Sequence, residues 1–199
     1  KNPNLNWIIK IHPANIVKDI RDKHFEKNLE IATLSRVLGD KPDHIHVLEA
    51  SSAVSTLSLF SIMDYCLTVR GTIGIEAAFR GIPVLTAGTG RYDGLGFTFD
   101  FNDKKEYIKQ LLSLEKLPLL TDSQIDLARK HAYAMFVVRP TRLSSISFEF
   151  MNDKSATLCS RIKVKNLEEL KGSDDVQNLS KWINSGKEDY CETRFDYLP

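Results

Sequence analysis

The segment Val69–Glu76 carries the residue types best suited to binding a charged ligand. A predicted apolar strand feeds a predicted helix there through small residues, and Gly71, Thr72 and Gly74 let an anion approach the backbone. The first N–H groups of a helix lack partners within the helix and lie at the positive end of its dipole. The spacing therefore predicts a phosphate site at this turn, with a hydroxyl contact from Thr72 and a charge-assisted contact from Arg70. In the alternative interpretation, Thr72 only caps the helix.

Glu76 is predicted to lie on the same face of that helix as Thr72, one turn further along. A carboxylate in this position can accept hydrogen bonds from the two vicinal hydroxyls of a ribose. A phosphate site followed by a ribose site indicates a nucleotide ligand. The alternative is a helical glutamate that only faces solvent.

Two other segments are candidates for ligand contacts. His12 follows a predicted strand and precedes Pro13, where its imidazole can donate to a phosphate or a sugar hydroxyl; a structural role in the turn is the alternative. The glycine-rich stretch 87–96 contains Gly88 and Tyr92 and is predicted to be a loop. Such a loop can close over a sugar, or it can be an ordinary surface loop.

Several other kinds of site are not expected. His44 and His46 share a face of a predicted strand, but no Cys or third His stands at a suitable spacing, so we expect no metal held by protein ligands. The sequence contains no P-loop motif, and no glycine fingerprint of dinucleotide-binding enzymes follows a first strand. It also lacks the Gly-x-Ser-x-Gly elbow of a hydrolase nucleophile.

Alternating strands and helices position these residues. The predicted strands cover 7–11, 44–48, 65–69 and 81–86, and the predicted helices between them cover 16–38, 55–63 and 71–79. Continuous apolar strands that alternate with helices are typical of the α/β class, here a Rossmann-like parallel sheet with helices on both faces. Ligands of such sheets bind beyond the carboxyl ends of the strands, where the candidates lie.

The second half of the chain is expected to be mainly helical. One helix is capped by Asn102-Asp103 and reaches Leu114, another runs from Thr121 to about Val138, and periodicity weakens after Thr141 except for a helix over 175–185. We therefore predict a Rossmann-like domain over 1–140, whose candidate residues indicate a nucleotide ligand. Residues 141–199 are predicted to form a helical and irregular C-terminal extension that packs on this domain or on a partner domain.

Composition bounds the class of protein. With 199 residues, 42% hydrophobic and 27% charged, the chain can form one main core, and its net charge of +1 gives no overall attraction to nucleic acid or anionic lipid. Three cysteines without metal-ligand spacing indicate a reducing compartment, which we take to be the cytoplasm. No run approaches the ~20 apolar residues that cross a bilayer. Because Lys1 is followed almost at once by a strand, we expect a piece of a longer chain.

The order of four segments resembles a known family. Lys10–Pro13, Asp64–Ala78 and Gly81–Leu85, followed by Gly88 and Tyr92, resemble the C-terminal, donor-binding domain of GT-B-fold glycosyltransferases. The likeness is greatest to capsule and surface-polysaccharide biosynthesis proteins, and it covers roughly residues 7 to 112. Arg70, directly before the turn, departs from many relatives and leaves the nucleobase and the number of phosphates open.

The resemblance implies a role for each matching residue. Gly71, Thr72 and Gly74 would surround the phosphates of the donor, Glu76 would meet the nucleotide, and His12 would lie near the phosphates or the sugar. Gly88 and Tyr92 would complete the substrate-binding set. The reaction implied is displacement at an anomeric carbon with a nucleotide leaving group, without a further cofactor or a metal.

The same resemblance implies partners. The donor is a nucleotide sugar, and a glycan acceptor would bind through an N-terminal domain that usually also supplies the catalytic base. Peripheral membrane association of the full-length protein is compatible with such a role, and no nucleic-acid partner is expected. Two alternatives remain: a nucleotide-sugar 2-epimerase or glycerol-phosphate polymer transferase of the same architecture, and a non-catalytic scaffold domain.

Overall fold

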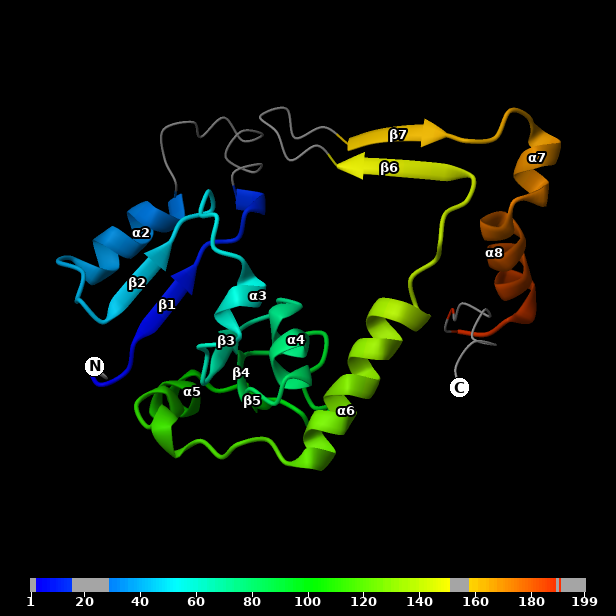
Figure 1. The fold of residues 1–199 in the computed structure, drawn as a ribbon. Helices are drawn as coiled ribbons and strands as arrows, with labels where there is room; N and C mark the ends of the chain where they lie inside the picture. The colour runs from blue at the N-terminus through cyan, green and yellow to red at the C-terminus, as the bar shows by residue number, and fades with distance from the viewer. Residues whose placement is uncertain (1–2, 16–28, 151–157, 189, 191–199) are drawn as a thin grey trace. The chain divides into compact units, whose positions relative to one another are not determined.

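The computed structural model describes residues 3–15, 29–150, 158–188 and 190 (Figure 1). These residues divide into two compact units. The first unit contains the described residues up to Val54 and those from Leu143 to Val176. The second contains Ser55–Arg142 and the described residues from Gln177 onward. The boundary predicted at residue 140 stays a prediction.

A three-stranded parallel sheet in the order β3-β4-β5 forms the centre of the second unit. β3 is Cys66–Thr68, β4 is Val84–Ala87 and β5 is Phe99–Phe101. The parallel pairing of β3 and β4, which are joined through a helix, confirms the predicted α/β class. The periodicity predicts no strand at β5, because three residues are too few to show one.

The helices of the second unit begin where the capping residues predict. They are α3 (Thr56–Leu59), α4 (Ile73–Phe79), α5 (Lys104–Leu111) and α6 (Asp122–Tyr133), with a short 3-10 turn at Leu114–Lys116. Asp103 caps α5 by accepting from the N–H groups of Lys105 and Glu106, and Thr121 forms a capping box with Gln124 at α6. The last predicted turn of α6 is wound as a π-helix, η2 (Ala134–Val138).

Small residues let α4 approach both the sheet and α6. Ala77, Ala78 and Ala128 are fully buried in one core cluster, as is Val84 of β4. In Figure 1, α4 lies against the sheet with α6 beside it. The core therefore lies directly beneath α4 and holds its start rigidly at the carboxyl end of β3.

The first unit contains a separate two-stranded parallel sheet. β1 (Trp7–Lys10) pairs with β2 (Ile45–Leu48), and α2 (Leu29–Leu38) lies between them in the chain. The predicted helix over 16–38 is confirmed from Leu29 to Leu38; its residues 16–28 lie outside the described residues.

An antiparallel hairpin in the first unit departs from the weak periodicity predicted after Thr141. β6 (Ile146–Phe150) pairs with β7 (Leu158–Ile162). The helices α7 (Leu167–Gly172) and α8 (Asp174–Ser185) follow, and α8 confirms the helix predicted over 175–185. The prediction misses this hairpin although Ile146–Phe150 alternates apolar and polar residues, a strand signal; Leu158–Ile162 shows no such alternation.

A buried carboxylate ties the start of the hairpin to the start of α8. Asp175 is 2% exposed and accepts hydrogen bonds from Ser145 N (3.0 Å), Ser145 Oγ (2.6 Å) and Ser144 Oγ (2.9 Å). Burial alone raises the pKa of Asp175, but these hydrogen bonds outweigh it and hold the pKa below the ordinary value.

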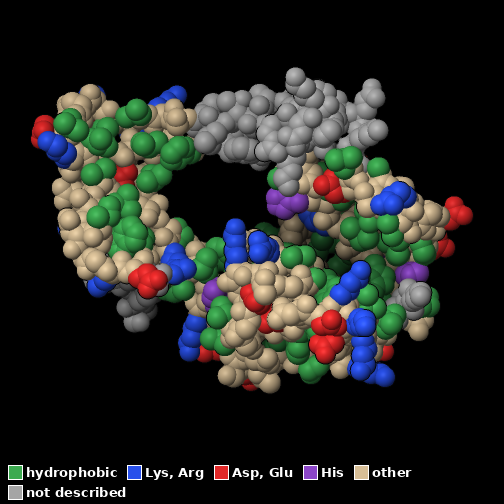
Figure 2. Space-filling view, turned by 180° about the vertical axis from the view of Figure 1, so that it is seen from behind, with side chains coloured by type: hydrophobic (Ala, Val, Ile, Leu, Met, Phe, Trp, Pro, Cys, Tyr) green, Lys and Arg blue, Asp and Glu red, His purple; other side chains and the backbone are tan. Residues whose placement is uncertain are grey.

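Charges of both signs are mixed on the surface. On the face drawn in Figure 2, Lys and Arg side chains alternate with Asp and Glu side chains, which agrees with a net charge of +1. Any site for an anion must therefore be built locally from a few groups.

Candidate functional site

At the start of α4, two backbone N–H groups have no acceptor in the described part of the chain. Gly71 N–H donates to Thr68 Oγ1 at 3.1 Å, and Gly74 N–H donates to the Gly71 carbonyl at 3.1 Å. Between them, the N–H groups of Thr72 and Ile73 have no acceptor among the residues that the structure describes. Thr72 is exposed, so an anion has access to this pair of donors.

Thr72 does not cap the helix with its side chain. It is the N-cap residue, but its backbone is already helical (φ −57°, ψ −21°) and its hydroxyl accepts no capping hydrogen bond. A capping threonine has an extended backbone, as Thr121 has at α6 (φ −72°, ψ 158°). The interpretation of Thr72 as a cap is therefore wrong for its side chain, and the hydroxyl remains available to a ligand.

Arg70 links the turn to the glycine-rich stretch. Its Nε donates to the Thr89 carbonyl at 3.3 Å, and its side chain is otherwise exposed. A guanidinium carries five N–H donors, so this contact orients the group and leaves other donors beside the start of α4.

Tyr92 contacts the turn from its buried side. It is 1% exposed, and its hydroxyl donates to the Gly71 carbonyl at 2.8 Å. A methyl group added to Gly74 would overlap that hydroxyl, so glycine is required there for the close approach. Burial raises the pKa of the Tyr92 hydroxyl to about 12, which keeps it a donor. The hydroxyl hydrogen is therefore engaged by the backbone. The predicted contact of Tyr92 with substrate stays a prediction.

Two carboxylates shape the glycine-rich stretch. Asp100 Oδ1 accepts from Thr86 Oγ1 and Thr98 Oγ1, both at 2.7 Å, and Asp100 Oδ2 accepts from Gly94 N at 2.8 Å. Asp93 Oδ1 accepts from Gly90 N at 2.7 Å. Asp100 is absent from the sequence prediction; a charged residue between two phenylalanines in Phe99–Phe101 was the only available signal.

Gly88 follows β4 with a positive φ of 95°, a backbone conformation that favours glycine. Its N–H donates to the Phe101 carbonyl at 2.8 Å, so it continues the pairing of β4 with β5. Gly88 therefore turns the chain out of the sheet.

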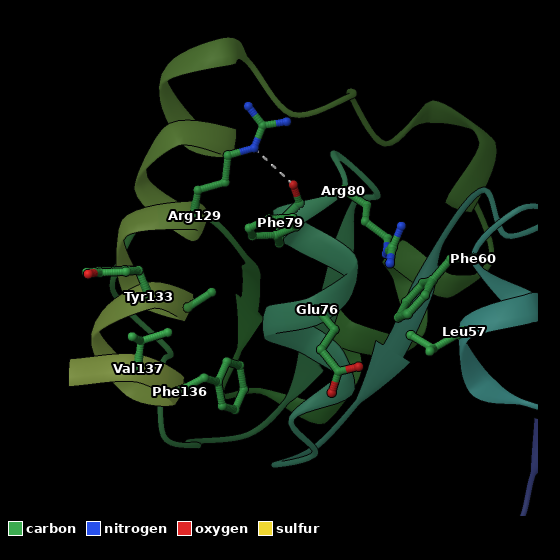
Figure 3. A pocket seen from close by; sticks show the side chains of 10 residues that line it. Leu57, Phe60, Glu76, Phe79, Arg80, Arg129, Tyr133, Phe136 and Val137 are labelled. Atoms are coloured by element: carbon green, nitrogen blue, oxygen red, sulfur yellow. Dashed lines mark hydrogen bonds between the residues drawn. The ribbon is translucent and has the colours of Figure 1, made fainter. Parts of the chain in front are cut away.

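Glu76 faces a groove that crosses the outer side of α4. The groove has a volume of about 370 Å³ and is lined from α3, α4, α6 and η2. Figure 3 shows the Glu76 carboxylate between Leu57 of α3 and Phe136 of η2. The carboxylate makes no hydrogen bond or ion pair with the other described residues, so its oxygens can accept from a ligand.

Cys66 begins β3 and is not a nucleophile candidate. It is 4% exposed. Burial raises the pKa of the thiol to about 12, and the Glu76 carboxylate adds to the rise. The thiolate that nucleophilic chemistry needs is therefore not populated near neutral pH.

A family model described as capsule polysaccharide biosynthesis protein matches residues 1–133. The chain belongs to this family. No curated protein and no solved structure matches it significantly. The matched residues of this capsule biosynthesis protein include β1 to β5 and extend to the end of α6, so the start of α4 and the glycine-rich stretch lie within the family region.

The predicted site residues of the capsule biosynthesis protein fall into two groups. One group lies on α4 or at its start in the second unit and consists of Arg70, Gly71, Thr72, Gly74, Glu76 and Tyr92. Gly88 belongs to the same unit and lies at the end of β4, where it pairs with Phe101. His12 belongs to the first unit, where it is exposed and its Nδ1 accepts from Ala14 N at 3.0 Å.

The described residues contain neither a metal-ligand cluster nor a membrane-spanning helix. No group of three or more His, Cys, Asp or Glu side chains in this part of the chain is arranged to hold a metal ion. None of the helices in the described ranges combines the length and apolar character that a membrane span needs.

Proposed function

We propose that this chain is the nucleotide-sugar-binding half of a glycosyltransferase that acts in bacterial capsule or surface polysaccharide biosynthesis. The observation that carries the proposal is the pair of N–H groups of Thr72 and Ile73, which have no acceptor in the described residues. They lie beside the uncommitted Thr72 hydroxyl and the Arg70 guanidinium at the carboxyl end of β3. Membership in the capsule biosynthesis family supports it.

In this proposal, the phosphates of the donor bind at the start of α4. The two amides and the positive end of the helix dipole receive phosphate oxygens, and Arg70 adds a charge-assisted contact. During transfer, the bond between the anomeric carbon and the leaving phosphate breaks. The same donors stabilise the negative charge that develops on the departing nucleotide.

The nucleoside lies one turn further along the helix. Glu76 accepts hydrogen bonds from the ribose hydroxyls, because it shares the Thr72 face of α4 and its carboxylate is not engaged by described residues. A second domain binds the acceptor glycan and supplies the catalytic base. The donor is the only small molecule required, and the full-length enzyme works at the cytoplasmic side of a membrane with which it associates peripherally.

Thermal denaturation with added nucleotides tests the proposal. We expect at least one of UDP, CMP and GDP to raise the melting temperature, since a ligand at 100 times its dissociation constant adds about 2.7 kcal/mol to the free energy of unfolding. Replacing both Thr72 and Glu76 by alanine should reduce the shift. The control variant replaces Ser123 and Glu115 by alanine and should retain the full shift in melting temperature, since both residues are exposed and lie elsewhere in the second unit. If none of the three nucleotides stabilises the chain, the donor-binding proposal fails and a scaffold role is favoured.

A further inference from the structure

One face of α6 holds the end of the glycine-rich stretch. Gln124, Leu127 and His131 lie three and four positions apart and so share this face. Gln124 Nε2 donates to the Gly96 carbonyl at 3.1 Å, and Leu127 lies so close to Gly96 that a methyl group added there would contact its Cδ2. The centres of the His131 and Phe97 rings are 5.3 Å apart. Residues 96 and 97 are therefore held against α6 at three points.

The contact between His131 and Phe97 reaches the start of α4 through Tyr92. Phe97 is fully buried, and its ring stacks on that of Tyr92 with the two centres 6.1 Å apart and the planes inclined by 24°. The Tyr92 hydroxyl donates to the Gly71 carbonyl at 2.8 Å. A displacement of Phe97 would leave Tyr92 without its stacking partner, so the packing at His131 influences the turn before α4.

The surroundings of His131 favour its neutral form. Its Nε2 is buried and has no hydrogen-bond partner among the described residues. Burial lowers the pKa of His131, and the positive charge of Arg139, at the end of η2, lowers it further. A protonated imidazole carries an N–H on both nitrogens, so Nε2 would need an acceptor that this site lacks. The contact of a cation with the Phe97 ring is worth less than the cost of burying a charged N–H without an acceptor.

The other titratable groups on the elements around α6 do not offset this effect. Asp100 of β5 already accepts three hydrogen bonds, and Glu76 of α4 faces the groove. Tyr92 has a pKa of about 12 and stays neutral. On α6 itself, Lys130 pairs with Asp126 at 2.7 Å. No carboxylate in the described ranges forms an ion pair with the imidazole, so nothing there favours its charged form.

We propose that His131 is a pH-sensitive latch, whose neutral ring holds Phe97 against α6 and whose protonation releases residues 92–97 from this contact. The charged ring moves into water, and the Tyr92 hydroxyl loses its fixed position at the turn before α4. The held form disfavours protonation and the released form does not. The held form therefore predominates above the ordinary histidine pKa of about 6.5, and this advantage is lost as pH falls below that value.

Amide hydrogen exchange on the whole chain, followed by NMR spectroscopy, tests the latch. Between pH 7.5 and 5.5, the unsubstituted protein should lose protection over residues 88–97 by up to about tenfold, after correction for the intrinsic pH dependence of exchange. The reason is that at pH 5.5 a histidine of ordinary pKa is protonated about ten times more often than not. The amides of α5 are the internal reference and should keep their protection.

Two substitutions at His131 separate protonation from packing. His131→Phe keeps an aromatic ring beside Phe97 but cannot take up a proton, so protection over residues 88–97 should be the same at both pH values. His131→Gln is also neutral and should likewise abolish the pH dependence. His46→Phe, at an exposed position in the first unit, is the matched control and should retain it. Circular dichroism verifies that each variant is folded.

Three results would overturn the latch. The first is protection that does not change with pH in the unsubstituted protein, whether or not the variants fold. The second is a pH-dependent loss that persists in a folded variant at His131, because another group would then be titrating. The third is an equal loss across α5, which would reflect unfolding of the whole unit. These measurements use no nucleotide, so the proposed function stands or fails separately.

Discussion

At Gly74, the lack of a side chain makes room for the Tyr92 hydroxyl, which donates to the Gly71 carbonyl at 2.8 Å. This contact holds the turn from its buried side and leaves the N–H groups of Thr72 and Ile73 on the exposed side. A single glycine therefore permits the arrangement on which the donor site depends.

Gly74→Ala should destabilise the protein, although alanine is the better helix former by about 1 kcal/mol. Overlap with the Tyr92 ring and hydroxyl should lower the free energy of unfolding by about 1–3 kcal/mol. Tyr92→Phe alone should lower it by about 1 kcal/mol through the lost hydrogen bond. Urea denaturation should show the double variant to be less destabilised than the sum of the two. Additive losses would show that Gly74 and Tyr92 do not interact.

Element ends in the second unit are determined by side chains close in the chain. Thr121 Oγ1 accepts from Gln124 N at 3.3 Å, and Gln124 Oε1 accepts from Thr121 N at 3.0 Å. Both hydrogen bonds of the capping box are therefore formed. Gln124 Nε2 also donates to the Gly96 carbonyl at 3.1 Å. The start of α6 is thereby tied to the end of the glycine-rich stretch.

Thr121→Ala should lower the free energy of unfolding by about 1 kcal/mol, because it removes the acceptor for an N–H group at the start of α6. The measurement is the midpoint of urea denaturation. Ser123→Ala, at an exposed position in the first turn of the same helix, should change the free energy of unfolding little. Equal effects of the two changes would contradict the cap.

For the chain as a whole, Asp175 makes stability depend on pH. It joins segments 30 and 31 residues apart through the hydrogen bonds of Ser145 and Ser144. Its pKa in the folded chain lies below the ordinary value despite the opposing effect of burial. The ionised carboxylate therefore stabilises the folded state above an unfolded-state pKa of about 3.9, and this contribution is lost as pH falls toward the folded-state pKa.

Asp175→Asn should lower the free energy of unfolding at pH 7 by about 1.5–3 kcal/mol, the range for hydrogen bonds to a charged group. Below about pH 5, the variant should lose less further stability than the unsubstituted protein. Denaturation at a series of pH values provides the comparison. Asp40→Asn, at an exposed position in the first unit, should retain the original pH dependence. A variant with the same acid dependence as the original would exclude Asp175 as its source.

Local sequence was enough to predict the α/β class, the strand–turn–helix at Gly71 and the starts of α5 and α6. At the turn and at the helix starts, the hydrogen bonds concerned join residues two to four positions apart, as between Asp103 and Glu106, and the class follows from the alternation of strands with helices. The same reasoning gave a side-chain cap at Thr72 as the alternative to a ligand contact, and only this alternative is wrong, because the turn is held by Thr68 and Tyr92 instead. It also missed the hairpin of β6 and β7.

Only the tertiary structure decided which distant side chains meet. The groove brings Glu76 of α4 to Phe136 of η2 and Leu57 of α3, and Asp100 reaches Thr86 on the neighbouring strand. Periodicity and capping report on neighbours within one turn of helix or one strand. Contacts between elements depend on the packing of fully buried residues such as Ala77 and Ala128, which bring α4 and α6 together and leave no local pattern in the chain.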